Sequence, residues 1–226
     1  MATLGGRDRV KFTVFTASDS DEMAELLSEA FVARDPPAVA AGLTSSEFED
    51  FVRLFCPKAT GEGLTMVARS ADTGEMMGAV LAEDSATGAP AGINRLSARF
   101  DPIFDILGQL EADYQGGREV NPGESLHLFL LGVRERFGGQ GVAHQLIAEC
   151  VANGARKGYQ VAVAEATNRT SQHIFRKLGF VERARASYSA HRFEGRAIFA
   201  SIASQGGPIL MDRVLLGGAM PVLQGL

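Results

Sequence analysis

The sequence has no tryptophan and only two cysteines, and aromatic residues make up 8% of its 226 residues. The two cysteines, Cys56 and Cys150, form neither a disulfide framework nor a zinc-binding pattern, which indicates a reducing compartment. No apolar run reaches the roughly 18 residues of a membrane-spanning helix, and residues 1–10 lack the apolar segment of a secretory signal. We therefore expect a cytoplasmic protein without a membrane partner.

Basic residues are outnumbered as well. Lysine and arginine total 22 against 27 aspartates and glutamates, which gives a net charge of −5. A nucleic-acid-binding protein carries a basic patch, and the sequence has none, so we expect no nucleic-acid partner. Hydrophobic residues make up 46%, as in globular proteins. We expect residues 1–226 to form a single domain with a core motif at 126–180 and short tails at 1–10 and 216–226.

Hydrophobic periodicity predicts strands and helices in alternation along the second half of the chain. A strand, a glycine turn, a helix, a strand and a helix follow one another, which is typical of a βαβα unit with parallel neighbouring strands. Turn residues at 72–74 join two earlier strands in a hairpin, so the sheet must be mixed. The predicted strands cover 11–16, 64–69, 75–82, 126–133, 159–166, 181–188 and 208–215. The predicted helices cover 22–31, 45–56, 102–114, 142–157 and 168–178.

Glycines gather in the connection between the fourth predicted strand and the helix after it. Gly138, Gly139 and Gly141 allow positive φ and a close backbone approach, and the turn leads into a helix N-terminus, which favours a phosphate. The turn predicts a pyrophosphate cradle, although a tight turn without a ligand would have the same glycines. A Walker loop is excluded because Gly-Lys-Ser/Thr is missing. A dinucleotide-binding fingerprint fails because His144 occupies the place of its last glycine.

Two motifs in this half resemble those of the GNAT superfamily of acyl-CoA N-acyltransferases. The run from Gly138 to Ala143 resembles the family's Arg/Gln-x-x-Gly-x-Gly/Ala, and residues 168–180 resemble its Asn-x-x-Ala-x-x-Leu-Tyr-x-x-Leu-Gly-Phe helix. The resemblance is strong over residues 126–180 and weaker at 72–78 and 209–215. Either motif alone is moderately specific, and the two at this spacing are strong.

The resemblance implies an α/β (α+β) fold. Its sheet would be mixed and mostly antiparallel, with about seven strands, a splayed parallel pair and flanking helices. It also implies acetyl-CoA as co-substrate and no metal. Backbone groups of Leu131 to Val133 would bond the pantetheine arm, and N–H groups of Gly139 to Ala143 would hold the pyrophosphate. The implied acyl-CoA-binding residues are Leu131, Gly132, Val133, Gly138, Gly139, Gln140, Gly141, Val142, Ala143, Asn168, Ser171 and Phe175.

The sequence departs from the family pattern at two places. Gly138 stands where the family has Arg or Gln, which leaves the backbone to supply most of the cradle. Phe175 stands where the family has the tyrosine that protonates the leaving thiolate, and a phenyl ring cannot donate a proton. Ser171 or Tyr188 is the expected substitute, or water supplies the proton.

Two residues are candidates for the general base that removes a proton from the amine. His127 matches one of two histidines in vertebrate arylalkylamine N-acetyltransferases, and Phe129 stands at the other. Asp35, followed by two prolines, resembles the catalytic Glu-Pro segment of the insect enzymes. Thr167 and Ser171 match two hydroxyls of that insect pattern, so Asp35 has a slight preference. The other three histidines are expected at the surface, and Glu165 faces an unknown side of its strand.

The resemblance implies an acetyl-CoA-dependent N-acetyltransferase that acts on a primary amine, a small arylalkylamine or polyamine, by direct attack in a ternary complex. The helix-rich segment 92–122 is expected to help wall the amine pocket. The alternatives are a non-catalytic acyl-CoA-binding or sensor domain on the same fold, and a protein N-acetyltransferase. The expected catalytic residues are Asp35, His127 and Ser171, in a monomer or homodimer.

Overall fold

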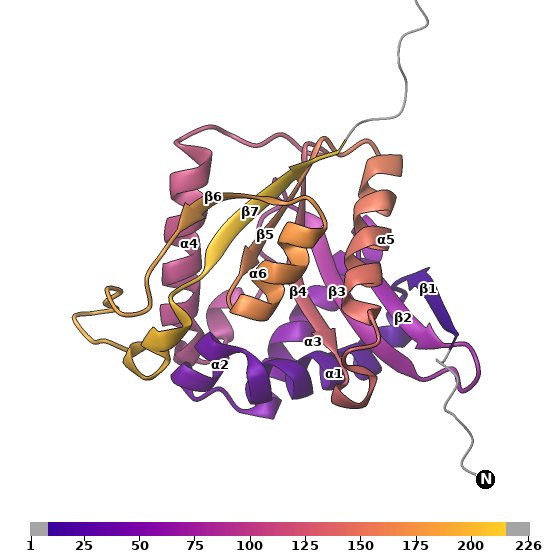
Figure 1. Cartoon of the computed structure of the whole chain (residues 1–226), viewed down its shortest axis with the longest axis horizontal. Helices are drawn as coiled ribbons and strands as arrows, with labels where there is room; N and C mark the ends of the chain where they lie inside the picture. Colours follow the sequence, from indigo (N-terminus) through magenta and orange to yellow (C-terminus); the bar gives the residue numbers. More distant parts are fainter. Residues whose placement is uncertain (1–8, 216–226) are drawn as a thin grey trace, which may run out of the picture.

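The computed structural model describes residues 9–215 and shows a seven-stranded sheet with helices on both faces (Figure 1). The predicted tails lie outside these residues except for Arg9 and Val10, and Val10 already begins the first strand. The strands are β1 Val10–Val14, β2 Met66–Ser70, β3 Met76–Asp84, β4 Ser125–Val133, β5 Val161–Ala166, β6 Val181–Arg185 and β7 Ile209–Val214. The helices are α1 Ser20–Arg34, α2 Pro36–Ala41, α3 Ser45–Glu62, α4 Asp101–Gln115, α5 Val142–Arg156 and α6 Arg169–Lys177.

The strand order in the sheet is β1-β2-β3-β4-β5-β7-β6. Five of the neighbouring pairs are antiparallel, and β4 and β5 form the parallel pair. The predicted mixed sheet is therefore confirmed, together with its hairpin at β2–β3 and its parallel neighbours on either side of the glycine turn. The parallel pair lies near the middle of the sheet, which puts the end of β4 inside the molecule.

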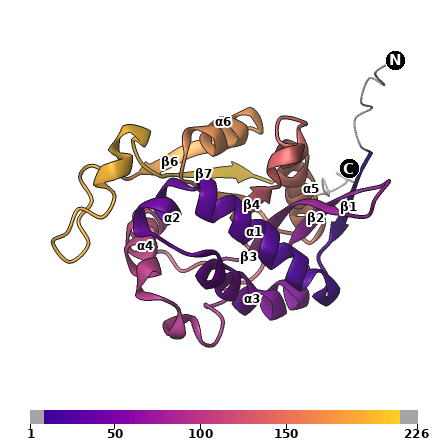
Figure 2. The same cartoon turned by 90° about the horizontal axis from the view of Figure 1, so that it is seen from below.

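The helices cover the two faces of the sheet unequally (Figure 2). Helices α5 and α6 lie on one face, where they enclose a core with β2 to β5 and β7. Helices α1 and α3 cover the opposite face over β2 to β4, and α4 continues that layer over β5 to β7. Among residues 9–215, no helix combines the length and the apolar character needed to cross a membrane.

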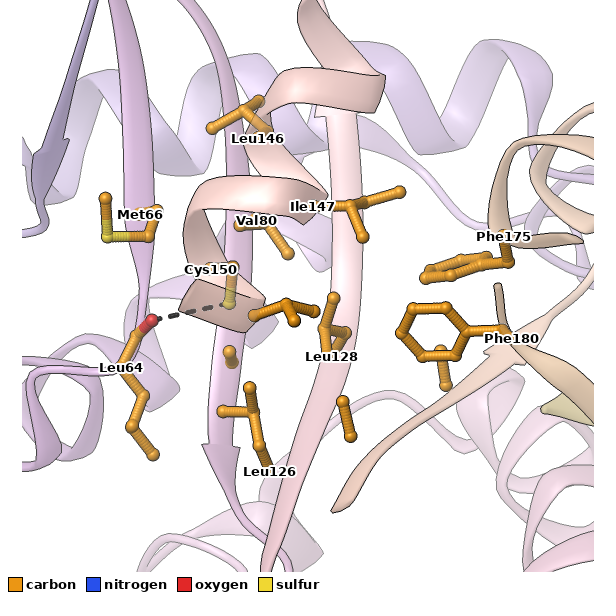
Figure 3. Packing of buried hydrophobic residues seen from close by; sticks show 14 of the residues in the cluster. Leu64, Met66, Val80, Leu126, Leu128, Leu146, Ile147, Cys150, Phe175 and Phe180 are labelled. Carbon is orange, nitrogen blue, oxygen red and sulfur yellow. Dashed lines mark hydrogen bonds between the residues drawn. The ribbon is translucent and has the colours of Figure 1, made fainter. Parts of the chain in front are cut away.

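The core under α5 shows what the apolar positions of that helix do (Figure 3). Leu146, Ile147 and Cys150 are completely buried against β2 to β4. The Cys150 thiol lies 3.6 Å from the carbonyl oxygen of Leu64, and burial raises its pKa to about 12. It therefore remains a protonated, small apolar side chain, as the helical pattern predicted.

Several predicted element boundaries differ from the structure, and the end of α3 differs most. Helix α3 continues through Pro57 to Glu62 and ends at Gly63, whose φ is +62°. Its buried face extends past the proline to Ala59, so packing outweighs the local cost of a missing N–H. Strand β6 ends at Arg185, before the predicted residue 188, because the chain leaves the sheet there and buries Tyr188 against α4.

Asp35 separates α1 from α2, as its two following prolines predict. Its φ and ψ are −80° and 118°, an extended conformation that ends α1 at Arg34. Pro36 begins α2, and the Asp35 carboxylate accepts a hydrogen bond from the Ala38 N–H at 3.2 Å. The cap fixes the carboxylate at the corner between the two helices.

Strands β4 and β5 pair only along their first residues. Ser125 to His127 lie opposite Val161 to Val163, after which β5 pairs with β7 alone. A bulge on β4 accompanies the divergence, since Leu130 pairs with Leu81 and Leu128 with Ala82, which leaves Phe129 as the extra residue. The two strands therefore splay apart at the C-terminal half of β4.

Candidate active site

A cavity of about 470 Å³ lies where β4 and β5 diverge. Residues 128–133 of β4 form one wall, and Glu165, Thr167 and the start of α6 form the opposite wall. The cavity reaches the α5–α6 side of the sheet at Ala143 and Phe175, and the other side at helices α1, α3 and α4. Two molecules entering from opposite faces of the sheet can therefore meet between the splayed strands.

The end of the cavity toward α3 and α4 is lined by phenylalanine rings. Phe51 is central, with ring centroids 4.7 Å from Phe100, 5.8 Å from Phe104 and 5.7 Å from Phe129. Phe100 and Phe104 come from the helix-rich segment 92–122, which therefore lines the cavity. The full set of phenylalanines on this side is Phe31, Phe48, Phe51, Phe100, Phe104 and Phe129. Such a surface favours a flat apolar group over a charged one.

Asp35 is a buried carboxyl on the wall of this cavity. Its Oδ1 accepts a hydrogen bond from Thr167 Oγ1 at 2.5 Å, across 132 positions of sequence. Burial raises the pKa of Asp35 to about 6, and the hydrogen bonds from Thr167 and from the Ala38 N–H oppose that rise. The group is therefore ionised at neutral pH and has a proton affinity suited to a general base.

Tyr188 lies beside this pair and is completely buried. Its hydroxyl donates to the Thr167 carbonyl oxygen at 2.7 Å. Burial raises the pKa of Tyr188, and the Asp35 charge raises it further. The hydroxyl is therefore protonated over the whole physiological range, and it holds the backbone of the residue that bonds Asp35.

The other predicted base, His127, has very different surroundings. Its Nε2 lies 2.6 Å from Glu165 Oε2, and its Nδ1 lies 3.2 Å from Glu83 Oε1. Although burial opposes it, the two carboxylates raise the pKa of His127 to about 10. The ring is doubly protonated at neutral pH and donates to both glutamates, so it has no free nitrogen to accept a proton. Lys58 balances the second carboxylate, with Nζ 2.6 Å from Glu83 Oε2.

The glycine turn has the backbone geometry of an anion cradle. Gly139 and Gly141 have φ values of +73° and +85°, and Gly141 is the N-cap of α5. The N–H groups of the first turn of α5 have no intrahelical acceptors and point out of the helix N-terminus. A Cβ at Gly138 would lie 2.9 Å from the Glu135 carbonyl oxygen, so an Arg or Gln there would require the turn to open.

The predicted residues on α6 form the cap of that helix. Asn168 Oδ1 accepts from the Ser171 N–H at 2.9 Å, and Ser171 Oγ donates back to the Asn168 carbonyl oxygen at 2.9 Å. Both side chains line the cavity, as does Phe175, whose ring packs edge-on against Phe180 at 4.9 Å. Figure 3 shows these two rings next to each other.

The expectation for the remaining histidines holds for two of three. His144 and His173 are exposed, whereas His191 is buried, so its predicted surface position is wrong. His191 Nε2 lies 2.7 Å from Asp105 Oδ2, and its ring lies 5.4 Å from that of Phe199. The segment between β6 and β7 folds back onto α4, and its sequence has no periodicity that would predict this.

Sequence reasoning did not identify Glu83 and Lys58 as partners of His127. Glu83 is the cross-strand neighbour of His127 on β3, and only the strand register reveals this. For Glu165, the sequence indicates a position on a strand but does not determine which face of the sheet the carboxylate is on. It points to the α4 face, as does Val163, whereas the alternating Ala162, Ala164 and Ala166 belong to the core under α5 and α6.

The chain is similar to known proteins in part of its sequence and in its fold. Residues 110–192 match the model of the acetyltransferase (GNAT) domain family. The C-terminal condensation domain of Ebony, solved with beta-alanyl-dopamine, superposes with a TM-score of 0.84 at 12% identity over 92% of this chain and 99% of that one. Arylalkylamine N-acetyltransferase 2 from Aedes aegypti superposes with a TM-score of 0.76 at 21% identity over 92% and 100%.

The polyamine N-acetyltransferase of Drosophila melanogaster superposes with a TM-score of 0.73 at 17% identity over 92% of this chain and 100% of that one. A search of curated proteins finds no match. At these identities the neighbours show a shared fold, while the matched segment covers the glycine turn and the helix after it. The matched segment and the shared fold confirm the predicted resemblance to the GNAT acetyltransferases and support an N-acetyltransferase.

Proposed function

We propose that this protein is an acetyl-CoA-dependent N-acetyltransferase of small primary arylalkylamines. One observation carries the choice of acceptor: the buried Asp35 carboxyl lines the same cavity as six phenylalanine rings. An aromatic ring packed among the phenylalanines leaves a short aminoalkyl chain free to bring its nitrogen to Asp35. The neighbours that act on arylalkylamines support this acceptor class.

The residues around the splayed strands fit acetyl-CoA as the second substrate. Beyond His127, the side of β4 toward β5 has no strand partner among residues 9–215, so its N–H and C=O groups are available to the pantetheine arm. We assign the pantetheine contacts to Leu131, Gly132 and Val133, and the pyrophosphate to the cradle Gly138 to Ala143. The acetyl thioester supplies the electrophilic carbonyl carbon.

The Arg34 side chain limits which backbone groups of β4 are free to bond the pantetheine arm. Its Nη2 donates to the Val133 carbonyl oxygen at 2.7 Å, which occupies the last acceptor of the β4 edge. The pantetheine must therefore bond the preceding residues of the strand or displace the arginine. Because Arg34 is exposed, displacing it into solvent costs little.

Asp35 performs the first chemical task. It accepts a proton from the bound ammonium ion, directly or through a water molecule, and the neutral nitrogen then attacks the thioester carbonyl. Thr167 holds the carboxylate in place through its hydrogen bond, and free N–H groups of β4 stabilise the developing oxyanion. The carbon–sulfur bond breaks as the amide forms, and the proton that the attacking nitrogen loses passes to the thiolate through water or the Ser171 hydroxyl. The products are the N-acetylamine and the free thiol.

His127 has a different role in this proposal. His127 is already protonated and bonded to two carboxylates, so it takes no proton from the amine. Its contact with Glu165 fixes the position of that carboxylate. The assignment departs from the vertebrate pattern that first suggested His127 as a base.

A thiol-release assay with acetyl-CoA tests the proposal. We expect phenylethylamines to be acetylated with the highest kcat/KM in a panel that also contains polyamines, amino acids and peptides. Higher kcat/KM for a polyamine or a peptide N-terminus would overturn the acceptor class. No thiol release with any amine, combined with tight acetyl-CoA binding by calorimetry, would indicate the non-catalytic acyl-CoA-binding alternative.

A further inference from the structure

The Thr167–Asn168 peptide lies between the end of β5 and the start of α6, outside the hydrogen-bond ladders of both elements. Its carbonyl oxygen accepts a hydrogen bond from the Tyr188 hydroxyl at 2.7 Å, and its N–H donates to Ser171 Oγ at 3.3 Å. The side chain of Thr167 bonds Asp35. The two groups proposed above for proton transfer, Asp35 and Ser171, are therefore both attached to this one peptide.

We infer that Tyr188 is a positioning residue for acetyl transfer: its hydroxyl fixes the Thr167–Asn168 peptide, and the peptide holds Asp35 and Ser171 in place. The inference rests on the proposed function and adds to it a residue from outside the cavity wall. Tyr188 is completely buried and does not line the cavity, so it does not reach the leaving thiolate, although the sequence made it a candidate acid.

The Tyr188 ring is anchored on the α4 side of the sheet. It packs with Ile106 of α4 and with Phe199, whose ring centroid lies 5.5 Å away. Its backbone N–H donates to the Gly206 carbonyl oxygen at 3.0 Å, which joins the two ends of the connection between β6 and β7. The connection runs beside α2 and α4 (Figure 2). Asp35 is the N-cap of α2, so the same packed layer holds the hydroxyl and the base.

The hydroxyl of Tyr188 does more than the ring alone would do. A phenyl ring would fill the same space, but the Thr167 carbonyl oxygen would lose the donor that fixes it. The peptide would then be free to rotate, and the bond from the Thr167 hydroxyl to Asp35 would weaken. That bond stabilises the charged carboxylate and lowers its pKa, so its weakening should raise the pKa of Asp35 above about 6.

No other charged side chain on the cavity wall is bonded to Asp35 within residues 9–215. The charged residues there besides Asp35 are Arg34, Glu165 and Arg169. The first bonds the end of β4, the second bonds His127, and the third bonds the connection between β6 and β7. Helix α2 has no titratable side chain. A change in the Asp35 pKa on loss of the Tyr188 hydroxyl therefore reports on the Thr167 bond.

Tyr188→Phe removes the hydroxyl and keeps the ring. In a thiol-release assay with acetyl-CoA and phenylethylamine, kcat should fall by about tenfold or more, because the reacting groups lose their alignment. Both KM values should stay within about threefold, because Tyr188 does not line the cavity. The rise of kcat/KM through about pH 6 should move up by roughly half a pH unit or more. The pKa of Asp35, read without substrate from the carbon-13 shift of its carboxyl, should move equally.

Tyr159→Phe is the matched control. Tyr159 is 8% exposed, and its hydroxyl donates to Asp84 Oδ2 at 3.1 Å, away from the cavity. Both variants lose one hydrogen bond of a phenolic hydroxyl, so both should melt a few degrees below the wild type. Only Tyr188→Phe should change kcat and the midpoint of the pH profile.

Thr167→Val tests the route from Tyr188 to Asp35. It removes the hydroxyl, keeps a branched side chain, and should raise the midpoint at least as much as Tyr188→Phe. The double variant should have the midpoint of Thr167→Val, because the Tyr188 hydroxyl acts on Asp35 only through Thr167. Midpoint shifts that add in the double variant would mean a different route, and the inference would be wrong.

Other outcomes would also overturn the inference. A folded Tyr188→Phe protein with the wild-type kcat and midpoint would show that Tyr188 serves packing alone. If Tyr188→Phe does not fold, Thr167→Val decides, because an unchanged Asp35 pKa in that variant removes the link between the peptide and the base. Absence of thiol release by the wild type with every amine is a failure of the proposed function, and the carbon-13 titration of Asp35 then still tests the role of Tyr188.

Discussion

Asp35 is buried and His127 is largely buried, and both are candidates for the base, yet their surroundings differ in charge. Asp35 has neutral partners, a threonine hydroxyl and a backbone N–H. His127 has two carboxylates, one at each ring nitrogen. Burial disfavours the charged form of both groups. The neutral partners leave Asp35 with a pKa of about 6, while the carboxylates raise that of His127 to about 10.

A buried titratable group serves as a base only when its proton-accepting form dominates near neutral pH. Asp35 is an anion with capacity for a proton, whereas His127 already carries both protons and is neutralised by its partners. Substitutions at the two positions test this difference directly.

Asp35→Asn should lower kcat by about 100-fold or more, because an amide cannot accept the proton from the ammonium ion. In the wild type, kcat/KM should rise with pH through about 6 as Asp35 ionises, and the variant should lose this rise. Thiol release across pH 5–9 and calorimetry with acetyl-CoA measure both effects, and acetyl-CoA affinity should remain unchanged.

Asp212→Asn is the matched control for Asp35. Asp212 is also a buried carboxylate, but its partners are Tyr114 and Arg183, and it does not line the cavity. Its loss should lower the melting temperature and leave kcat unchanged. If Asp35→Asn keeps kcat within a few-fold of the wild type at every pH, Asp35 is a structural cap and the proposed base is wrong.

Gly141→Val should weaken acetyl-CoA binding at least tenfold, because a side chain at the N-cap of α5 blocks the approach of the pyrophosphate. Apart from its chain neighbours, only Gln145 among residues 9–215 lies within 4 Å of a Cβ at this position, so the protein itself has room for the substitution. The backbone does not favour it, since φ is +85° and such strain costs about 1–3 kcal/mol.

Gly158→Val separates strain from binding. Gly158 lies just beyond the other end of α5 and has a φ of +95°. Within the described part of the chain, no atom beyond its immediate neighbours lies within 4 Å of a Cβ there. Both variants should lose similar stability in thermal melts, and only Gly141→Val should lose affinity in calorimetry. Equal acetyl-CoA affinity in the two folded variants would show that the turn is no cradle.

His127→Gln should destabilise the protein by about 3 kcal/mol, because the largely buried Glu165 loses its cationic partner while Glu83 keeps Lys58. The folded-state pKa of His127 is about 10, above the ordinary value of 6.5, so its stabilisation is complete below pH 6.5 and declines as pH rises through 10. The wild-type melting temperature should therefore fall between pH 7 and 10, and the variant should fall less over that range.

The pH–rate profile of His127→Gln distinguishes a structural role from a catalytic one. The rise of kcat/KM through about pH 6 should persist, since Asp35 is unchanged. Loss of that rise, with the folded fraction intact in a thermal melt, would return His127 to the role of base.

The sequence predicted the elements and the glycine turn because those depend on local patterns. Period and turn residues are enough to place a strand before Gly138 and a helix after Gly141. The end of α3 could not be predicted from local patterns, because the packing of buried Ala59 stabilises the helix beyond Pro57. The splay of β4 from β5 depends on long-range pairing and entered only through the resemblance.

The sequence predicts part of the site. The contacts that it does not predict depend mainly on the register between strands. Asp35 and Thr167 were both recognised from their motifs, but their hydrogen bond spans 132 positions and follows from the fold. Glu165 and Glu83 could not be assigned to His127, since a shift of one residue on either strand would turn the carboxylate to the other face. His191 was misplaced because its buried segment has no helical or strand period.

Phe175→Tyr should have the smallest effect, and the structure gives a control for it. Phe175 lines the cavity, so a hydroxyl added to its ring can point into that space, and the variant should melt within a few degrees of the wild type. We expect kcat to be unchanged, or raised if protonation of the leaving thiolate limits turnover.

Phe180, whose ring packs against Phe175, is 3% exposed and does not line the cavity. Phe180→Tyr should therefore bury an unpaired hydroxyl and lose about 1–3 kcal/mol. If Phe175→Tyr is destabilised as much as Phe180→Tyr, or folds normally and loses most of its kcat, the ring edge faces the core, and this position does not correspond to the family's tyrosine.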